Sequence, residues 1–210
     1  PIHSELVDCV YREWESFFQS EKKHDYLFDP IKQDGYFPKG TENAKGYPIK
    51  DHKEFYHFYP WGRLPDTLTE ATEELYESLV DMTSTLLEWV EKNTPEEVRS
   101  QFSEPLKNMI RGSKTNLLRI IHYPPFSGKE DNRSLRAAAH EDINLITLLV
   151  AGTRPGLEAK DNNGTWHKIT TDPGTIIVNI GDMLKEASGG YYPSTTHRVV
   201  NPEKGSNNDS

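Results

Sequence analysis

The chain has 210 residues, of which 34% are hydrophobic, and these include four Trp, ten Tyr and eight Phe. This length and apolar content suit one folded domain with a substantial core. A net charge of -9 argues against a nucleic-acid or anionic-membrane partner, and no apolar run approaches the ~20 residues that a membrane helix needs.

Cysteine content bears on the compartment of the protein. Cys9 is the only cysteine, so no intrachain disulfide can form and a reducing, cytoplasmic location is expected. No signal-peptide pattern is present. Because the sequence begins at Pro1 without a Met and ends in Asn-Asn-Asp-Ser, we expect a chain that is truncated at both ends.

Residues 1–114 are expected to form a helical and loop region that packs on a β-barrel. Apolar residues recur at helical spacing from 3 to 20 and again from 66 to 93, which predicts two amphipathic helices. Asp66 or Thr67 is the expected cap of the second helix. The aromatic stripe of the first helix is expected to be core.

The segment between these helices, residues 21–65, is rich in Gly, Pro, Lys and Tyr and predicts a long irregular stretch. Long segments of this kind in compact domains are often functional. We expect residues 30–65 to cover one mouth of the barrel as a lid. Tyr36, Lys45 and Tyr47 are its candidate substrate-binding residues.

From Thr115 the hydrophobic pattern changes to the period of β-strands, which predicts an antiparallel sandwich or barrel over 115–202. Asp161-Asn162-Asn163-Gly164 is a hairpin turn signal. A polar tail, 203–210, completes a single domain over 1–210. The predicted strands span 116–123, 135–142, 145–150, 157–159, 165–169, 175–179 and 197–200.

Two histidines and one aspartate carry the candidate chemistry. His140 and Asp142 occupy positions i and i+2 of a predicted strand, so both side chains can point to one face while Glu141 points away. His197 opens the last predicted strand, and the fold could return it to the same place. Two imidazoles and one carboxylate form the facial triad of non-haem Fe(II) oxygenases, which leaves coordination positions open for substrate chemistry.

Arg119 and Tyr123 are candidate binding residues on the first predicted strand. They share a face by alternation, so if Tyr123 points into the barrel, Arg119 does too. A buried arginine needs an anion. Two options stay open for Arg119: an internal ion pair with an acidic side chain, or a carboxylate of the substrate or co-substrate, bound in bidentate fashion.

Several stretches together resemble the iron(II)/2-oxoglutarate-dependent dioxygenases, in the branch of isopenicillin N synthase, and they cover most of the chain. They are Gly-Tyr-Phe-Pro-Lys-Gly-Thr-Glu-Asn-Ala-Lys-Gly (35–46), Asp-His-Lys-Glu-Phe (51–55), Leu-Leu-Arg-Ile-Ile-His-Tyr-Pro-Pro (117–125), His-Glu-Asp (140–142), Pro-Gly-Leu-Glu-Ala (155–159), Gly-Thr-Trp-His-Lys-Ile (164–169), Gly-Thr-Ile-Ile-Val-Asn-Ile-Gly-Asp-Met-Leu (174–184) and Ser-Thr-Thr-His-Arg-Val-Val-Asn-Pro (194–202).

The resemblance implies a fold that is mainly β with flanking helices (α+β), around a double-stranded β-helix or jelly-roll core. It implies Fe(II) on His140, Asp142 and His197. It also suggests Tyr123 as a hydrogen-bond donor to the distal carboxylate of the co-substrate 2-oxoglutarate. No catalytic residue beyond the metal ligands is implied.

The chain departs from the family pattern at two places. Family members often have Thr at the position of Glu141, and because this side chain faces away from the metal we expect an effect on substrate preference rather than on metal binding. The Arg-x-Ser pair that binds 2-oxoglutarate should follow His197 closely, but no Arg occurs between Arg198 and Ser210. We expect the pair directly after Ser210, since alternation turns Arg198 away from His197.

We therefore expect an oxygenase that binds Fe(II) and 2-oxoglutarate and oxidises a small molecule with O2, giving succinate and CO2, with hydroxylation as the expected outcome. A carboxylate-bearing substrate is one option, from Arg119. The alternatives are an oxidase of the isopenicillin N synthase type, which does not use 2-oxoglutarate, and a non-catalytic jelly-roll binding protein. Dependence on the co-substrate separates the first alternative from the expected function, and turnover separates the second.

Overall fold

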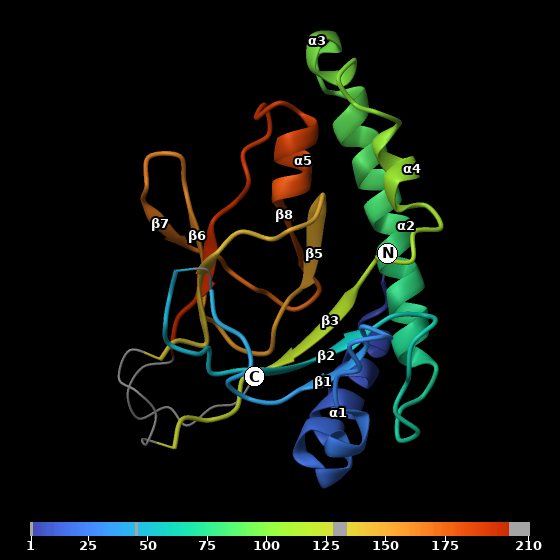
Figure 1. Ribbon diagram of the computed structural model, residues 1–210, viewed down its shortest axis with the longest axis vertical. Coiled ribbons are helices and arrows are strands. Elements are labelled where there is room, and N and C mark those ends of the chain that lie inside the picture. The colour runs from blue at the N-terminus through green and yellow to red at the C-terminus, as the bar shows by residue number, and fades with distance from the viewer. Residues whose placement is uncertain (1, 45, 128–133, 202–210) are drawn as a thin grey trace. The chain divides into compact units, whose positions relative to one another are not determined.

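The computed structural model describes residues 2–44, 46–127 and 134–201, and the chain forms two compact units (Figure 1). The expected division of a single domain at residues 114 and 202 stays a prediction, and the polar tail 203–210 lies outside the described residues. Unit 1 comprises Pro1–Pro38, Glu54–Asn93 and Glu104–His122, and unit 2 comprises Lys39–Lys53, Thr94–Ser103 and Tyr123–Ser210.

Unit 1 combines helices with a three-stranded antiparallel sheet. Both long predicted helices are confirmed, although the second begins after the expected caps because residues 65–68 form a turn, in which Leu68 N–H donates to the Pro65 carbonyl. The sheet has the order β1-β2-β3. The elements are α1 (Ser4–Gln19), the 3-10 helix η1 (Glu21–Tyr26), β1 (Gly35–Phe37), β2 (Glu54–Phe58), α2 (Ala71–Lys92), α4 (Leu106–Ile110) and β3 (Leu118–His122).

The aromatic stripe of α1 forms the core of unit 1, as predicted. Trp14, Phe17 and Phe18 are each no more than 3% exposed. Trp14 Nε1 donates a hydrogen bond of 2.9 Å to Thr72 Oγ1, which joins α1 to α2 while satisfying the buried indole N–H. The stripe therefore supplies packing rather than a cofactor site.

The expectation of an irregular segment over 21–65 is wrong in part, because β1 and β2 lie within it. Tyr36 of β1 pairs with Tyr56 of β2, and both rings contact Phe17 at centroid distances of 6.4 and 5.7 Å. Cross-strand aromatic pairs stabilise short strands when a core covers one face. These two strands therefore form because α1 gives their aromatic residues something to pack on.

A buried carboxylate lies at the centre of unit 1. Glu54 forms an ion pair with Lys23 Nζ (3.0 Å), accepts a hydrogen bond from the Tyr36 hydroxyl and contacts His122 Nδ1 (2.7 Å). Burial alone would raise the pKa of Glu54, but the hydrogen bonds from His122, Tyr36 and Lys23 outweigh burial and lower the pKa to about 2. Burial and the bond to Glu54 also raise the pKa of Tyr36. One ionised carboxylate thus ties together η1, β1, β2 and β3.

Unit 2 contains two antiparallel sheets, a four-stranded one of order β4-β9-β6-β7 and a two-stranded one of β5 and β8. The predicted hairpin turn is confirmed, with Asp161 N–H donating to the Thr165 carbonyl and Gly164 at φ +86°. The elements are α3 (Glu96–Arg99), β4 (Ala137–His140), β5 (Ile146–Val150), β6 (Leu157–Lys160), β7 (Trp166–Lys168), β8 (Ile176–Ile180), α5 (Asp182–Ala187) and β9 (His197–Val199).

These sheets confirm the predicted antiparallel core and its jelly-roll class. Two details differ from the prediction. The first predicted strand is β3, which pairs with β2 in unit 1 rather than with a strand of unit 2. The helix α5, which begins directly after Gly181, was not predicted because it is only 6 residues long. Among the described residues no helix is long and apolar enough to cross a membrane.

We predict that Glu54→Gln destabilises the protein at neutral pH by about 3 kcal/mol, since it leaves Lys23 and His122, both partly buried, without the carboxylate that they contact. The pKa of Glu54 is lowered on folding, so its contribution is present above the unfolded value of about 4.3 and is lost as the pH falls toward 2. Urea unfolding at pH 7 and pH 3 measures both effects. The gap between variant and wild type should shrink at pH 3, and Glu77→Gln on the exposed side of α2 should leave stability unchanged at both.

Candidate metal centre

The three predicted ligands meet in unit 2. One ligand atom from each of His140, Asp142 and His197 lies within 4.8 Å of the others. Asp142 Oδ1 is 3.8 Å from His140 Nε2 and 3.7 Å from His197 Nε2. The two histidines stand directly opposite each other in the β4–β9 pair, and Asp142 follows β4 by two residues. The fold therefore gathers two nitrogens and one oxygen around one point.

Each imidazole is oriented by its own backbone. His140 Nδ1 lies 2.7 Å from the Ala138 carbonyl, and His197 Nδ1 lies 2.9 Å from the Thr195 carbonyl. A carbonyl only accepts, so each Nδ1 carries a proton, and in a neutral ring Nε2 is then the nitrogen with the lone pair. A hydrogen bond on the far nitrogen is the usual support of a metal-binding histidine.

The Asp142 carboxylate is held by the other sheet. Its Oδ2 accepts hydrogen bonds from Thr147 Oγ1 of β5 (2.6 Å) and Asn179 Nδ2 of β8 (3.0 Å), which stand opposite each other in register. Asn144 Nδ2 donates to Thr147 Oγ1 (2.8 Å), so the threonine proton is directed at the carboxylate. With Oδ2 occupied, Oδ1 is the oxygen that faces the histidines.

The protonation states suit a cation. Burial and the neighbouring His197 lower the pKa of His140, against the bond from its ring to Ala138, so the ring is neutral at neutral pH. Burial would raise the pKa of Asp142, but the hydrogen bonds from Thr147 and Asn179 lower it, so the carboxylate is ionised. Neutral imidazole and ionised carboxylate are the forms that bind metal. Imidazole with carboxylate in this ratio suits Fe(II).

Comparisons with known proteins place the chain in a family. Residues 114–208 match the 2OG-Fe(II) oxygenase superfamily. A solved structure from Shewanella oneidensis, assigned as an oxygenase, is 49% identical with a TM-score of 0.89 over 100% of this chain and 76% of that one. A solved structure from Caulobacter crescentus, assigned to the 2OG-Fe(II) oxygenase family, is 30% identical with a TM-score of 0.76. The match covers 100% of this chain and 72% of that one. The chain belongs to the 2OG-Fe(II) oxygenase superfamily.

A curated relative shows how much of a related protein this chain spans. Flavonol synthase 1 from Crocosmia x crocosmiiflora is 30% identical over 215 residues, which is 97% of this chain and 62% of that protein. The chain therefore spans less than two thirds of this relative.

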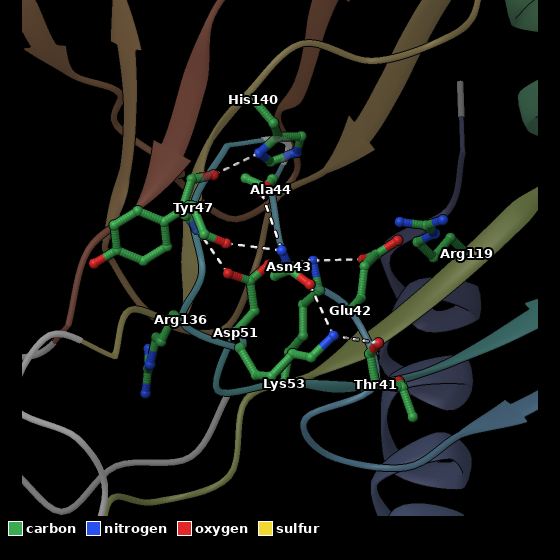
Figure 2. Close-up of polar contacts among 12 residues, drawn as sticks. Thr41, Glu42, Asn43, Ala44, Tyr47, Asp51, Lys53, Arg119, Arg136 and His140 are labelled. Atoms are coloured by element: carbon green, nitrogen blue, oxygen red, sulfur yellow. Dashed lines mark hydrogen bonds and ion pairs between the residues drawn. The ribbon is translucent and has the colours of Figure 1, made fainter.

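Of the other predicted residues, Tyr123 and Tyr47 lie in unit 2 with the triad. Tyr123 is half-buried, and the Arg136 guanidinium lies 5.6 Å from its ring centroid. Tyr47 borders a cavity of about 300 Å³ and packs on its own loop, where its N–H donates to Ala44 and its carbonyl accepts from Asn43 (Figure 2). The cavity is lined by Gly46, Tyr47, Leu135, Ala138, Ala139 and Arg198.

Two predicted substrate residues lie in unit 1 and need correction. Tyr36 is 2% exposed and packs in the core with its hydroxyl on Glu54, so it does not line a mouth. Arg119 is exposed rather than buried, with Nε donating to His57 Nε2 (3.1 Å). The prediction that Arg119 and Tyr123 share a face of one strand is wrong, because β3 ends one residue before Tyr123. Lys45 lies outside the described residues.

The residues that support Asp142 were missed, although the sequence holds a signal for two of them. Thr147 and Asn179 are polar positions within the apolar runs Leu-Ile-Thr-Leu-Leu-Val and Ile-Ile-Val-Asn-Ile. A buried polar side chain needs a hydrogen-bond partner. Given the resemblance to the superfamily and its carboxylate ligand, Asp142 could have been inferred as the hydrogen-bond partner of these two side chains.

Gly181 marks a close approach between α5 and the ligand loop. Asp182 N–H donates to the Asp142 carbonyl (2.8 Å), and a Cβ on Gly181 would lie 2.4 Å from the Asn144 carbonyl oxygen and 2.7 Å from that of Asp142. We predict that Gly181→Ala pushes this loop outward and weakens Co(II) binding by about 10-fold or more, a loss of the size typical when a residue that holds a metal ligand in place is changed. Co(II) titration by visible absorption measures it.

The control for this prediction is Gly152→Ala, where the nearest atom to an added Cβ is 3.9 Å away. It should bind Co(II) as the wild type does. Equal affinity in Gly181→Ala would show that the loop tolerates the methyl group and that the approach does not set the position of Asp142.

Proposed function

We propose that this chain carries the core of an Fe(II)- and 2-oxoglutarate-dependent oxygenase that oxidises a small molecule with O2, giving succinate and CO2, with hydroxylation as the outcome. The observation that carries the proposal is the convergence of His140, Asp142 and His197 on one point, with the pKa values of His140 and Asp142 both lowered toward the forms that bind metal. Membership of the superfamily supports the choice of iron and 2-oxoglutarate.

The donor set fits the metal. His140 and His197 would supply Nε2, and Asp142 would supply Oδ1 and one negative charge. Bound iron would supply a redox-active Lewis acid with open positions for the co-substrate and O2. The chain itself holds the three ligand side chains in place, the two imidazoles through backbone carbonyls and the carboxylate through Thr147 and Asn179.

We propose Tyr123 as a hydrogen-bond donor to the distal carboxylate of 2-oxoglutarate. Its support is the resemblance of the segment 117–125 to the family and the cation of Arg136 beside its ring, which favours an anion nearby. No Arg occurs in residues 199–210, so the Arg-x-Ser pair of the family is not contributed by the printed sequence.

The substrate side of the proposal is a small molecule. Tyr47, beside the 300 Å³ cavity, is the described candidate for contact with it. The option of a substrate carboxylate depended on a buried Arg119, and because Arg119 is exposed in unit 1 that option is not part of the proposal. No nucleic-acid or membrane partner is proposed, and the cytoplasmic location expected from the single cysteine stays a prediction.

We predict that anaerobic addition of Fe(II) and 2-oxoglutarate to the full-length protein produces a weak visible metal-to-ligand charge-transfer band. His140→Ala should abolish it and weaken Fe(II) binding at least ~100-fold, since losing a ligand costs more than losing its outer-shell partner. His167→Ala is the matched control, because that imidazole is exposed and contacts Asp161. It should leave the band unchanged.

The outcomes separate the alternatives. Iron binding without a band would favour an oxidase that does not use 2-oxoglutarate. Iron and 2-oxoglutarate binding with no oxygen uptake over a broad substrate panel would favour a non-catalytic binding protein. The absence of iron binding would contradict both enzymatic functions.

A further inference from the structure

The strand that carries His140 contains one extra residue. Ala137 pairs with Val199 and His140 pairs with His197, so three steps along β4 match two steps along β9. Such a β-bulge takes the backbone of the inserted residue out of the ladder and re-aims the side chains around it. Here the carbonyl of Ala138 turns to accept the His140 Nδ1 proton at 2.7 Å. The aim of the imidazole therefore depends on how Ala138 is held.

A carboxylate from a distant part of the chain holds Ala138. Asp51 Oδ1 accepts the Ala138 N–H at 3.1 Å, and the Asp51 side chain is only 4% exposed. The N–H and the carbonyl of Ala138 are thus both engaged, one by Asp51 and the other by His140. A bulged residue with both groups fixed cannot rotate its peptide planes freely.

Asp51 is itself fixed by a buried lysine. Lys53 Nζ lies 2.9 Å from Asp51 Oδ2 and 2.8 Å from Glu42 Oε2, and its side chain is 6% exposed. The backbone of the same segment is anchored as well, since Asp51 N–H donates to the Glu42 carbonyl (3.0 Å) and His52 N–H donates to the Leu135 carbonyl (2.8 Å). All these residues belong to unit 2.

A buried ion pair of this kind is weak as a source of stability, because removing two charges from water costs about as much as their attraction returns. A better explanation for this ion pair is that it fixes the direction of the Asp51 carboxylate. Oδ2 of Asp51 is engaged by Lys53, which leaves Oδ1 aimed at one backbone N–H. The Asp51–Lys53 pair therefore places one hydrogen-bond acceptor, Asp51 Oδ1, beside the Ala138 N–H of β4.

We propose that Asp51 is a positioning residue for the metal centre: its carboxylate holds the bulged Ala138, whose carbonyl sets the tautomer and direction of the His140 imidazole. This inference rests on the proposed metal site. It concerns His140 alone, because His197 is oriented by Thr195, for which the structure records no contact with Asp51.

The test uses two double variants of the 210-residue chain that both remove the buried charges. Asp51→Asn with Lys53→Met keeps an amide oxygen as an acceptor for the Ala138 N–H, whereas Asp51→Leu with Lys53→Met replaces that oxygen with an apolar group of similar size. Neither leaves an isolated buried charge, so both variants should fold. They differ at position 51 alone, where Asn offers an acceptor to the Ala138 N–H and Leu does not.

The first readout is the metal-free protein with ¹⁵N-labelled histidine, in which NMR distinguishes protonated from unprotonated ring nitrogens. The Leu variant should lose the single Nδ1–H tautomer of His140 and keep that of His197, which serves as an internal control. The Asn variant should keep both. This measurement needs neither iron nor 2-oxoglutarate, so it can fail or succeed independently of the proposed oxygenase function.

The second readout is Co(II) titration by visible absorption. The Leu variant should bind Co(II) 10- to 100-fold more weakly than the Asn variant, the range typical of losing an outer-shell partner. Asp161→Ala, which removes a carboxylate that accepts backbone N–H groups in the β6–β7 turn, should bind as the wild type does.

The proposal is overturned if the Leu and Asn variants give the same His140 spectrum and the same Co(II) affinity, whether both match the wild type or both are impaired. It is also overturned if His140 and His197 change together, since that would indicate a general loosening of the unit. Should the Leu variant not fold, single Asp51→Asn and Asp51→Ala substitutions replace the pair, with the same two readouts and the same order of effects expected.

Discussion

The register of β4 against β9 is the constraint on which the rest of the centre depends. It sets His140 opposite His197, and it is this pairing that brings two widely separated segments of the chain to one point. Asp142 reaches the same point only because β4 ends at His140 and the chain turns toward β5 directly afterwards. A shift of the pairing by one residue would send one imidazole to the opposite face.

The two sheets of unit 2 divide the work of preparing the centre. The four-stranded sheet carries both imidazoles, and backbone carbonyls orient them. The two-stranded sheet carries no ligand, but Thr147 and Asn179 reach from it to one oxygen of Asp142. The direction of the carboxylate is therefore a property of a different sheet from the one that sets the imidazoles. The centre therefore requires both sheets to be correctly formed, because neither sheet alone positions all three ligands.

Much of this could be predicted from the sequence, because periodicity and local motifs report on local structure. The strands from β3 to β9, both long helices and the three ligands follow from apolar spacing and the pattern of His140, Asp142 and His197. What failed depended on distant partners. The stretch from Asp51 to Glu54 is polar and looks solvated, yet all four side chains are buried. Their burial depends on Ala138, Leu135, Lys23 and His122, which no local pattern reveals. Alternation also failed for Arg119 and Tyr123, since a strand boundary fell between them.

The extra residue in β4 makes the length of this strand matter more than its composition. In a regular strand Ala137 and His140, an odd number of positions apart, would face opposite sides; the insertion reverses that parity, so both face the same side as Val199 and His197. Exchanging Ala138 or Ala139 for another small residue changes only local packing. Deleting either residue would turn every later side chain of β4 to the opposite face of the sheet. A substitution in this segment therefore changes packing at one position, whereas a deletion of one residue changes which side chain points toward His197 and Asp142.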